Sequence, residues 1–435
     1  MKRYAMDDLQ NWKERKDRKP LIIRGARQVG KTWLMKEFGK TNFEKVAYVN
    51  FDNNMRMKQI FEGDLQIDRL ILAISAETGV SIQADNTLLI FDEVQEVPRA
   101  LTSLKYFCEN APEYAIVAAG SLLGVALHQG TSFPVGKVNF MDLYPMSFKE
   151  FLCALGEERF ADILDGDDSS MVTMFNSKYI DRLREYYYVG GMPEAVNAFA
   201  ETKDFFQVRE IQKNLLDYYQ QDFSKHASAN LIPRLNLVWN SIPMQLAKEN
   251  KKFIYGQVRE GARAKDFELA IQWLMDCGLI HKVQRVTKPA LPLRAYLDFD
   301  AFKIYLMDVG LLVAMTDLDA KVIIDGNKIF TEFKGALTEQ YILQQLKADL
   351  GVEAYYYSAA NSKGEIDFLL QGATSVLPLE VKAEENLKAK SLRAYCEKYQ
   401  PKYAVRTSMS DYREQDWMTN ISLYDIGRIR KYLED

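Results

Sequence analysis

The chain has 435 residues, more than a single hydrophobic core usually supports, so we expect several domains. Its hydrophobic share of 48% and its charged share of 27% are typical of a globular protein. The formal net charge of -4 excludes a chain that is basic throughout, so any surface that binds nucleic acid has to be local.

The cysteines and histidines are scattered along the chain. The four cysteines form no C-x-x-C pair, and the three histidines are isolated. This pattern disfavours a zinc cluster or a disulfide framework and fits a reducing compartment. The amino terminus lacks an apolar signal core, and no run of about 18 uncharged apolar residues occurs. We therefore expect a cytoplasmic protein that has no membrane partner.

A glycine-rich loop follows the first apolar strand, which we place at residues 21–23. The loop reads G-A-R-Q-V-G-K-T, and a helical run begins at residue 33. Backbone N–H groups of such a loop and the start of the helix surround a phosphate oxyanion. Lys31 is expected to reach the β- and γ-phosphates of ATP, and the Thr32 hydroxyl to bind Mg²⁺. The expected nucleotide-binding residues are Gly25, Ala26, Arg27, Gln28, Val29, Gly30, Lys31 and Thr32.

Strands and helices alternate through the first 150 residues. This rhythm is typical of an α/β fold with a parallel sheet that is covered on both faces. The expected strands after the loop lie at 46–51, 88–93, 114–121 and 138–143, and amphipathic helices at 65–77 and 98–109.

The strand at 88–93 ends in two carboxylates, Asp92 and Glu93. Asp92 is expected to hold Mg²⁺ through water, and Glu93 to polarise the water that attacks the γ-phosphate. Glu93 favours hydrolysis, because a small-molecule kinase would leave this residue without a role. Ser121 ends the next strand and is a third catalytic candidate beside Glu93 and Lys31, as a sensor of the γ-phosphate. A plain capping role for Ser121 is the alternative.

Residues 147–230 are mostly helical and are predicted to form a lid on the nucleotide domain. A Gly-Gly-Met-Pro-Glu turn at 190–194 begins a helix, with proline near its first position. Arg182 and Arg184 precede this turn. Either residue could reach a phosphate, although solvated helix arginines are the simpler interpretation.

Residues 231–325 show the order of a winged helix. Helices near 234–248 and 264–277 precede two strands that are joined by a basic loop. The basic side chains suit contacts with DNA phosphates. A winged-helix module that serves only domain packing is the alternative. The basic residues in question are Lys282, Arg285, Lys288 and Arg294.

The last 110 residues carry a second chemical pattern. Strands are expected at 353–358, 364–370 and 376–382, after a helix at 332–347. Alternate residues of a strand share a face, so Glu380 and Lys382 point the same way. Asp367 and Glu380 on adjacent strands could hold one Mg²⁺, as metal-dependent phosphodiester hydrolysis requires. A strand pair with a solvated ion pair is the alternative. Pro378 lies inside the third strand and removes a ladder donor, which favours domains that only bind over a nuclease.

Taken together, these motifs resemble a bacterial and archaeal family of AAA+ ATPases with a carboxyl-terminal domain of unknown function. The resemblance implies a P-loop domain, a winged-helix segment and a restriction-endonuclease-like domain of the PD-(D/E)xK type. It also implies that Glu339, Asp367, Glu380 and Lys382 match the nuclease pattern. The chain lacks a clear arginine-finger motif, so the resemblance does not imply ring assembly. The motifs that carry it lie at 24–32, 91–93, 143–148, 190–194, 365–367 and 380–382.

The predicted organisation has four parts. They are a P-loop ATPase domain at 1–146, a helical lid at 147–230, a winged-helix-like domain at 231–325 and a restriction-endonuclease-like α/β domain at 326–435. The predicted function is ATP hydrolysis coupled to action on DNA. The alternative is a nucleotide-dependent switch whose carboxyl-terminal domains only bind nucleic acid or a protein partner.

Overall fold

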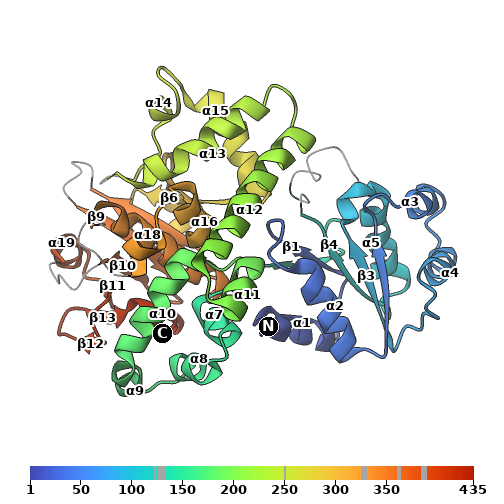
Figure 1. Ribbon diagram of the computed structural model, residues 1–435, viewed down its shortest axis with the longest axis horizontal. Helices are drawn as coiled ribbons and strands as arrows, with labels where there is room; N and C mark the ends of the chain where they lie inside the picture. Colours follow the sequence, from blue (N-terminus) through green and yellow to red (C-terminus); the bar gives the residue numbers. More distant parts are fainter. Residues whose placement is uncertain (122–123, 125–133, 249–250, 325–330, 360–363, 384–388) are drawn as a thin grey trace. The chain divides into compact units, whose positions relative to one another are not determined.

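The computed structural model describes residues 1–121, 124, 134–248, 251–324, 331–359, 364–383 and 389–435. The chain forms two compact units (Figure 1). Arg3–Tyr144 and Gln272–Leu279 make up the amino-terminal unit. Met1–Lys2, Pro145–Ile271 and Ile280–Asp435 make up the carboxyl-terminal unit. No helix of the described ranges is both long and apolar enough to cross a membrane.

The amino-terminal unit is built on a five-stranded parallel sheet in the order β2-β3-β4-β1-β5. The predicted α/β fold with a parallel sheet is confirmed. Its carboxyl strand ends lie along one edge, where the loops that follow β1, β3 and β4 meet. The elements are α1 (Ala5–Glu14), β1 (Leu21–Arg24), α2 (Lys31–Asn42), β2 (Lys45–Asn50), α3 (Met55–Glu62), α4 (Ile67–Thr78), β3 (Thr87–Asp92), η1 (Val94–Glu96), α5 (Pro98–Asn110), β4 (Ala115–Ala119) and β5 (Asn139–Asp142).

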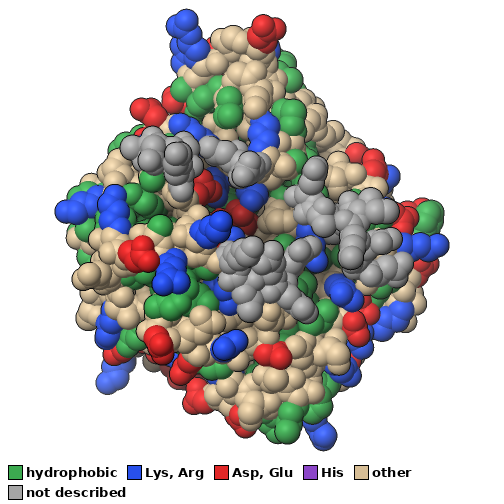
Figure 2. Space-filling view, turned by 90° about the vertical axis from the view of Figure 1, so that its left-hand side faces the viewer, with side chains coloured by type: hydrophobic (Ala, Val, Ile, Leu, Met, Phe, Trp, Pro, Cys, Tyr) green, Lys and Arg blue, Asp and Glu red, His purple; other side chains and the backbone are tan. Residues whose placement is uncertain are grey.

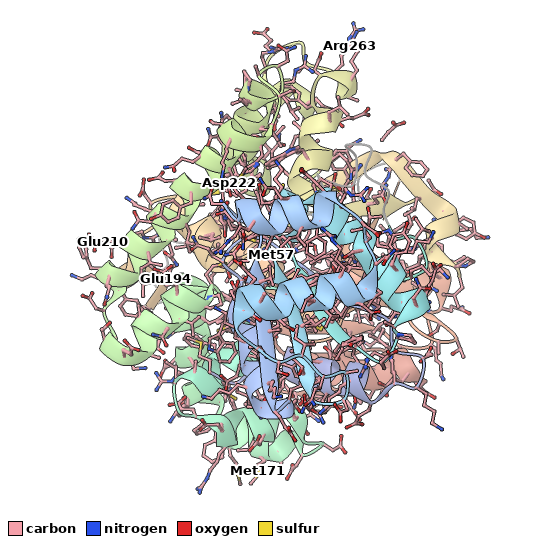
Figure 3. All side chains as sticks on the ribbon, turned by 90° about the vertical axis from the view of Figure 1, so that its right-hand side faces the viewer. Met57, Met171, Glu194, Glu210, Asp222 and Arg263 are labelled. Carbon is pink, nitrogen blue, oxygen red and sulfur yellow. The ribbon has the colours of Figure 1, made fainter. Side chains whose placement is uncertain are left out.

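An aromatic cluster holds one face of this sheet. Strands β3 and β4 are buried along their whole length, as their near-continuous apolar runs require. Phe51, Phe61 and Phe91 pack edge to face, with ring centroids 5.3–5.8 Å apart. Helix α3, which carries the buried Met57, covers this face (Figure 3). Each such ring pair adds about 0.5–1.5 kcal/mol beyond the area it buries.

The carboxyl-terminal unit combines a helical region with an eight-stranded mixed sheet. The helices before the sheet are α7 (Phe148–Ala154), α8 (Glu158–Asp165), α9 (Ser169–Met174), α10 (Asn176–Val189), α11 (Pro193–Thr202), α12 (Phe205–His226), α13 (Ile232–Leu246) and α14 (Tyr255–Val258). Helix α15 (Ala264–Asp276) belongs to this unit up to Ile271 and to the amino-terminal unit from Gln272. The later elements are β6 (Ile280–Val286), η2 (Leu293–Tyr296), β7 (Leu297–Leu306), α16 (Val309–Met315), α17 (Ala320–Ile324), α18 (Thr331–Ala348), β8 (Ala354–Ser358), β9 (Glu365–Gln371), β10 (Val376–Val381), α19 (Lys390–Tyr399), β11 (Val405–Ser408), β12 (Arg413–Glu414), β13 (Thr419–Ser422), η4 (Leu423–Arg430) and α20 (Lys431–Glu434).

The predicted wing hairpin, β6–β7, is part of the carboxyl-terminal sheet. The strand order is β12-β13-β11-β10-β9-β8-β6-β7, and β6 pairs with β8 at Arg285 and Tyr356. The sequence did not indicate this pairing. The helices and hairpin expected of a winged helix are present in the expected order, but the separate winged-helix domain stays a prediction.

Strand β10 holds Pro378 in the interior of the sheet. The strand lies between β9 and β11 in the interior of the sheet. Pro378 is opposite Leu369 of β9, and the parallel ladder with β11 begins only at Leu379. The proline is therefore tolerated because it comes just before that ladder starts.

The Gly-Gly-Met-Pro-Glu turn has a packing role. Gly190 has a φ of 73°, and a Cβ there would lie 2.1 Å from Oδ1 of Asp308. The Gly191 N–H donates to the buried Asp308 carboxylate at 2.6 Å, and Met146 N–H donates to the Gly191 carbonyl at 2.7 Å. Glu194, at the start of α11, is exposed (Figure 3). Two of the motifs that carried the family resemblance thus meet at one turn.

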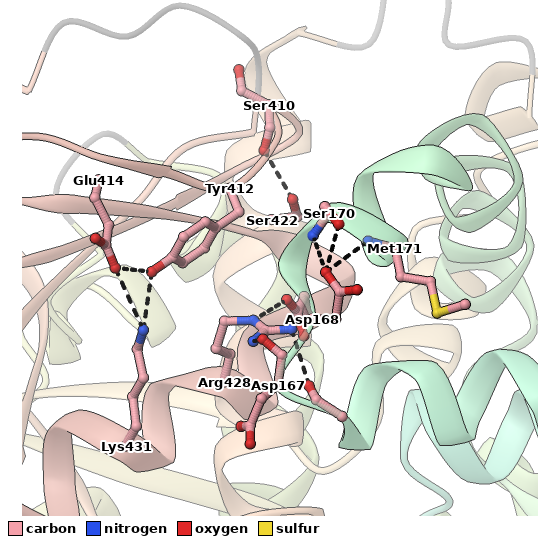
Figure 4. A network of polar contacts seen from close by, with 12 residues as sticks. Asp167, Asp168, Ser170, Met171, Ser410, Tyr412, Glu414, Ser422, Arg428 and Lys431 are labelled. Atoms are coloured by element: carbon pink, nitrogen blue, oxygen red, sulfur yellow. Dashed lines mark hydrogen bonds and ion pairs between the residues drawn. The ribbon is translucent and has the colours of Figure 1, made fainter.

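The helical region at 147–230 belongs to the same compact unit as the carboxyl-terminal sheet. Arg428 of η4 donates to the carbonyl oxygens of Gly166 and Asp167 at 3.2 and 2.9 Å, between α8 and α9 (Figure 4). It also pairs with Asp425 at 2.6 Å. These helices also pack on α16, which lies in the same unit. Their role as a lid on the nucleotide domain stays a prediction.

Candidate nucleotide site and carboxylate cluster

The loop between β1 and α2 has the backbone of a phosphate cradle. Gly25, Gln28 and Gly30 all have positive φ, at 146°, 66° and 96°. A Cβ on Gly25 would lie 2.2 Å from the carbonyl oxygen of Leu143. Glycine at position 25 therefore satisfies both the backbone angle and the close approach.

Lys31 begins α2 and is folded back onto this loop. Its side chain is buried, and Nζ donates to the carbonyl oxygens of Gly25 at 2.9 Å and Ala26 at 2.7 Å. Burial lowers the pKa of Lys31 to about 8, although the carboxylates of Glu93 and Asp92 oppose this shift. Both described hydrogen-bond partners of the ammonium group are thus neutral, and carboxylates lie close to it at the end of β3.

Asp92, at the end of β3, accepts hydrogen bonds from two hydroxyl groups. Its Oδ2 accepts hydrogen bonds from Thr32 Oγ1 at 2.7 Å and from the Tyr48 hydroxyl at 3.0 Å. Burial and the Asp92 carboxylate raise the pKa of Tyr48. Thr32 and Asp92 are hard oxygen donors, which suit a magnesium ion that keeps most of its ligands as water and phosphate.

Glu93 lies directly after Asp92 with its backbone in the left-handed region, at φ 50°. Its carboxylate accepts hydrogen bonds from the Ser121 hydroxyl at 3.2 Å and from Gln95 Nε2 at 2.7 Å. The structure therefore brings the residue at the end of β4 to the carboxylate at the end of β3. A positive φ at a non-glycine residue is strained, and such strain concentrates at functional sites.

The expected residues Lys31, Thr32, Asp92, Glu93 and Ser121 meet at one sheet edge. Sequence analysis missed two contributors, Tyr48 and Gln95. Tyr48 is placed by the pairing of β2 with β3, which no local motif records. Gln95 lies two residues after Glu93, and an amide in that turn was the available signal.

In the carboxyl-terminal unit, Glu339 of α18 is surrounded by cation and hydroxyl donors. Oε1 pairs with Lys251 Nζ at 2.5 Å, and Oε2 accepts from the Tyr305 hydroxyl at 2.9 Å. Lys303 Nζ lies 3.7 Å from the same Oε2 and 2.5 Å from Oε1 of Glu365. Burial raises the pKa of Glu339, but the two lysines more than offset this effect and lower it.

Asp367 and Glu380 lie on the neighbouring strands β9 and β10, and Lys382 directly follows β10. Asp367 Oδ2 accepts from the Val381 N–H at 2.7 Å, and Lys382 Nζ pairs with Glu380 Oε1 at 2.7 Å. Burial and the Glu339 carboxylate raise the pKa of Asp367. Glu380 is 3% exposed, and its Oε2 has no hydrogen-bond partner among the described residues.

Among the described residues, no three or more His, Cys, Asp or Glu side chains form a group that could hold a metal ion. Glu339 does not fit a metal centre while Lys251 and Lys303 both lie beside it, because the two ammonium groups already balance its negative charge. Asp367 and Glu380 are the carboxylates that remain as possible ligands. Sequence analysis missed Lys303, whose signal was a charge inside the apolar run Ala301–Leu306.

The basic residues of the predicted winged helix are occupied by local partners. Arg285 pairs with Asp298, and Arg294 donates to the Tyr355 hydroxyl at 3.3 Å. Lys282 and Lys288 lie over the rings of Phe302 and Tyr296, at 4.2 and 5.6 Å from their centroids. On the face shown in Figure 2, basic side chains are interspersed with acidic ones.

The two arginines before the glycine turn also have partners within their own unit. Arg182 pairs with Glu157 at 2.8 Å and with Glu185 at 2.9 Å. Arg184 lies 3.8 Å from Asp181. These contacts match the simpler interpretation of helix-surface arginines.

Three family models match parts of the chain. Residues 17–152 match an AAA domain, residues 180–322 match a domain of unknown function (DUF8612), and residues 334–426 match another domain of unknown function (DUF4143). The middle match crosses the predicted boundary at residue 230. A search of curated proteins finds no match.

Solved structures that match the chain include a Walker-type ATPase of Pyrococcus abyssi, at 14% identity and a TM-score of 0.45, covering 72% of this chain and 94% of that one. The Orc1 protein of Aeropyrum pernix in complex with DNA matches at 13% identity and a TM-score of 0.27, covering 72% of this chain and 90% of that one. Cdc6p from Pyrobaculum aerophilum matches at 12% identity and a TM-score of 0.25, covering 74% and 93%. The family matches and the parallel sheet show that the chain carries an AAA-type P-loop ATPase domain and a carboxyl-terminal DUF4143 domain.

Proposed function

We propose that the protein binds ATP with Mg²⁺ at residues 25–32 and hydrolyses it. The observation that carries this proposal is the meeting of Thr32, Asp92 and Glu93 at the carboxyl ends of β1 and β3. Lys31 holds the phosphates, while Thr32 and Asp92 orient the metal, which when bound neutralises phosphate charge. Glu93 accepts a proton from the attacking water, and Ser121 positions the Glu93 carboxylate.

Phosphate release from ATP tests this proposal. We expect release that requires Mg²⁺ and that Asp92→Asn reduces strongly, because the amide removes negative charge from the metal site. Asp85→Asn, on an exposed turn of the same unit, is the matched control. Equal turnover in Asp92→Asn and the control would remove Asp92 from the site.

We propose as a second function that the carboxyl-terminal unit cleaves phosphodiester bonds at Asp367, Glu380 and Lys382. The free, buried Oε2 of Glu380 favours this function, since a buried carboxylate oxygen without a partner is costly unless a ligand completes it. Lys382, paired with the other oxygen of Glu380, would stabilise charge on the scissile phosphate. The substrate class is nucleic acid, with DNA as the expected partner.

The alternative is a nucleotide-dependent switch, in which ATP changes the arrangement of the domains and the carboxyl-terminal unit only binds DNA or a protein. The lysines that pair with Glu339, Glu365 and Glu380 support this alternative, because they leave little negative charge for a metal.

A cleavage assay separates the two functions. Purified protein with ATP and with Mg²⁺ or Mn²⁺ is incubated with single-stranded and duplex DNA and RNA. The nuclease proposal predicts cleavage that Asp367→Asn abolishes and that Asp416→Asn, an exposed control in the same unit, leaves intact. ATP hydrolysis without cleavage of any substrate would favour the switch.

A further inference from the structure

Lys303 is a lysine in the middle of a buried strand. It lies within Ala301–Leu306 of β7, where every residue is buried, and its side chain is 0% exposed. Removing an ammonium ion from water costs several kcal/mol unless charged partners compensate. The burial of the Lys303 ammonium group therefore has to be compensated by its partners.

Those partners are two carboxylates from different elements. Nζ lies 2.5 Å from Glu365 of β9 and 3.7 Å from Glu339 of α18. Lys251 binds the other oxygen of Glu339 at 2.5 Å, and the Tyr305 hydroxyl donates to the oxygen that faces Lys303. A cation thus lies between two carboxylates at the distances of direct ion pairs.

A divalent ion between carboxylates supplies the same charge compensation in metal-dependent sites. We call Glu339, Glu365, Asp367 and Glu380 the carboxylate cluster. In one half, Glu339 and Glu365, lysine side chains of the chain itself already supply a cation. In the other half, Asp367 and Glu380, one oxygen of Glu380 has no partner among the described residues.

We propose that Lys303 takes the place of a divalent ion between Glu339 and Glu365, so that this half of the cluster binds no metal. Removal of the amine turns the pair into a divalent-cation site. The inference goes beyond the proposed function and holds whether or not Asp367 and Glu380 support cleavage.

The test is manganese binding to nucleotide-free protein, counted by electron paramagnetic resonance. All variants carry Asp92→Asn, which removes the metal ligand of the P-loop. Lys303→Met should bind one more Mn²⁺ per chain than the Asp92→Asn parent. The double change Lys303→Met with Glu365→Gln should remove that extra ion. Lys347→Met is the matched control, because Lys347 pairs with the exposed Glu353 at 2.7 Å.

Thermal unfolding provides a second readout. Without metal, Lys303→Met should melt at least about 5 °C lower than the parent, since it leaves buried carboxylates without a cation. Adding Mn²⁺ should restore much of the lost melting temperature in Lys303→Met. In the control and in the double variant, Mn²⁺ should shift the melting temperature no more than it does in the parent.

A folded Lys303→Met that binds no extra Mn²⁺ and gains no stability from it would overturn the inference. If Lys303→Met does not fold with or without metal, Glu365→Gln alone decides. The inference predicts the parent's Mn²⁺ count for this variant, because Lys303 rather than a metal occupies that carboxylate. Loss of one bound ion in Glu365→Gln would show that Glu365 is a metal ligand and would contradict the inference. The number of Mn²⁺ ions bound by the parent separately shows whether Asp367 and Glu380 bind a metal.

Discussion

The P-loop and the carboxylate cluster each bury a lysine near carboxylates, but they satisfy that lysine differently. Lys31 donates to two backbone carbonyl oxygens of its own loop, at 2.9 and 2.7 Å. Lys303 pairs with Glu365 and Glu339. A phosphate can displace neutral carbonyl partners, whereas a ligand at Lys303 would have to break ion pairs. A buried charge with neutral partners thus marks a place for a ligand, and one with ionic partners marks a closed structure.

The pKa shifts of the two lysines go in opposite directions because their partners differ. Burial lowers the pKa of Lys31 to about 8. Burial also acts to lower the pKa of Lys303, but Glu339, Glu365 and Asp367 more than offset it and raise the pKa. Lys31 therefore gains favourable charge interactions when an anion arrives, and Lys303 already has them.

The largest expected effect is that of Lys31→Ala on ATP binding. Loss of a buried positive charge that meets phosphate should weaken ATP binding roughly 10²–10³-fold by calorimetry. The melting temperature should change little, because the described partners of Lys31 are neutral carbonyl groups rather than carboxylates. Lys40→Ala, exposed on the same helix, is the control. Unchanged ATP affinity in Lys31→Ala would show that the loop assignment is wrong.

Tyr48→Phe should weaken the metal site without breaking it. The change removes one of two hydroxyl donors to Asp92, and loss of such an outer partner typically costs about 10–100-fold in metal affinity. The Mg²⁺ concentration that gives half-maximal ATP hydrolysis should rise accordingly, while metal-free ATP binding stays the same. Tyr106→Phe, on the surface of α5, should leave both quantities unchanged. An unchanged Mg²⁺ requirement in Tyr48→Phe would exclude this residue from the site.

ATP affinity should fall as the pH rises above about 8. The folded pKa of Lys31 is lowered to about 8, so the free protein carries this charge fully only below that pH. Phosphates favour the charged form, so binding above pH 8 requires proton uptake and weakens by up to about tenfold per pH unit. Calorimetry between about pH 7 and pH 9 measures this slope. A slope of the same size in Lys31→Ala would assign the effect to another group.

The smallest expected effect concerns DNA binding by the full-length protein. Binding should weaken with salt, and each phosphate contact should contribute about 0.9 to the slope of log affinity against log salt. Lys288→Ala should lower the slope by about that amount or less, since its amine lies over the Tyr296 ring. Absence of any DNA binding at low salt would leave domain packing as the role of residues 231–325.

The nucleotide site could be predicted from the sequence because its key residues lie in local patterns. Residues 25–32 form one continuous segment of loop and helix start, and Asp92 and Glu93 come at the end of an unbroken apolar run. The contact of Tyr48 with Asp92 depends on the pairing of β2 with β3, so no local pattern indicates it.

The carboxyl-terminal unit could be predicted only in its elements. The expected strands are present as β8, β9 and β10, but the addition of β6 and β7 to their sheet rests on a single long-range pairing with β8. The two lysines beside Glu339 are Lys251 and Lys303, which lie far from helix α18 in the sequence. A pattern such as Glu-x-Lys therefore locates the strand and says little about which cation meets each carboxylate.

The central claim is that the P-loop domain hydrolyses ATP with Glu93 as the base, and Glu93→Gln tests it most directly. ATP binding and phosphate release are measured side by side at saturating ATP and Mg²⁺, with Glu96→Gln, exposed in the same turn, as the control. We predict unchanged ATP affinity and a turnover that falls about 10²–10⁴-fold, as expected for loss of a positioned base. Turnover equal to that of the parent and the control, with ATP bound, would contradict the account.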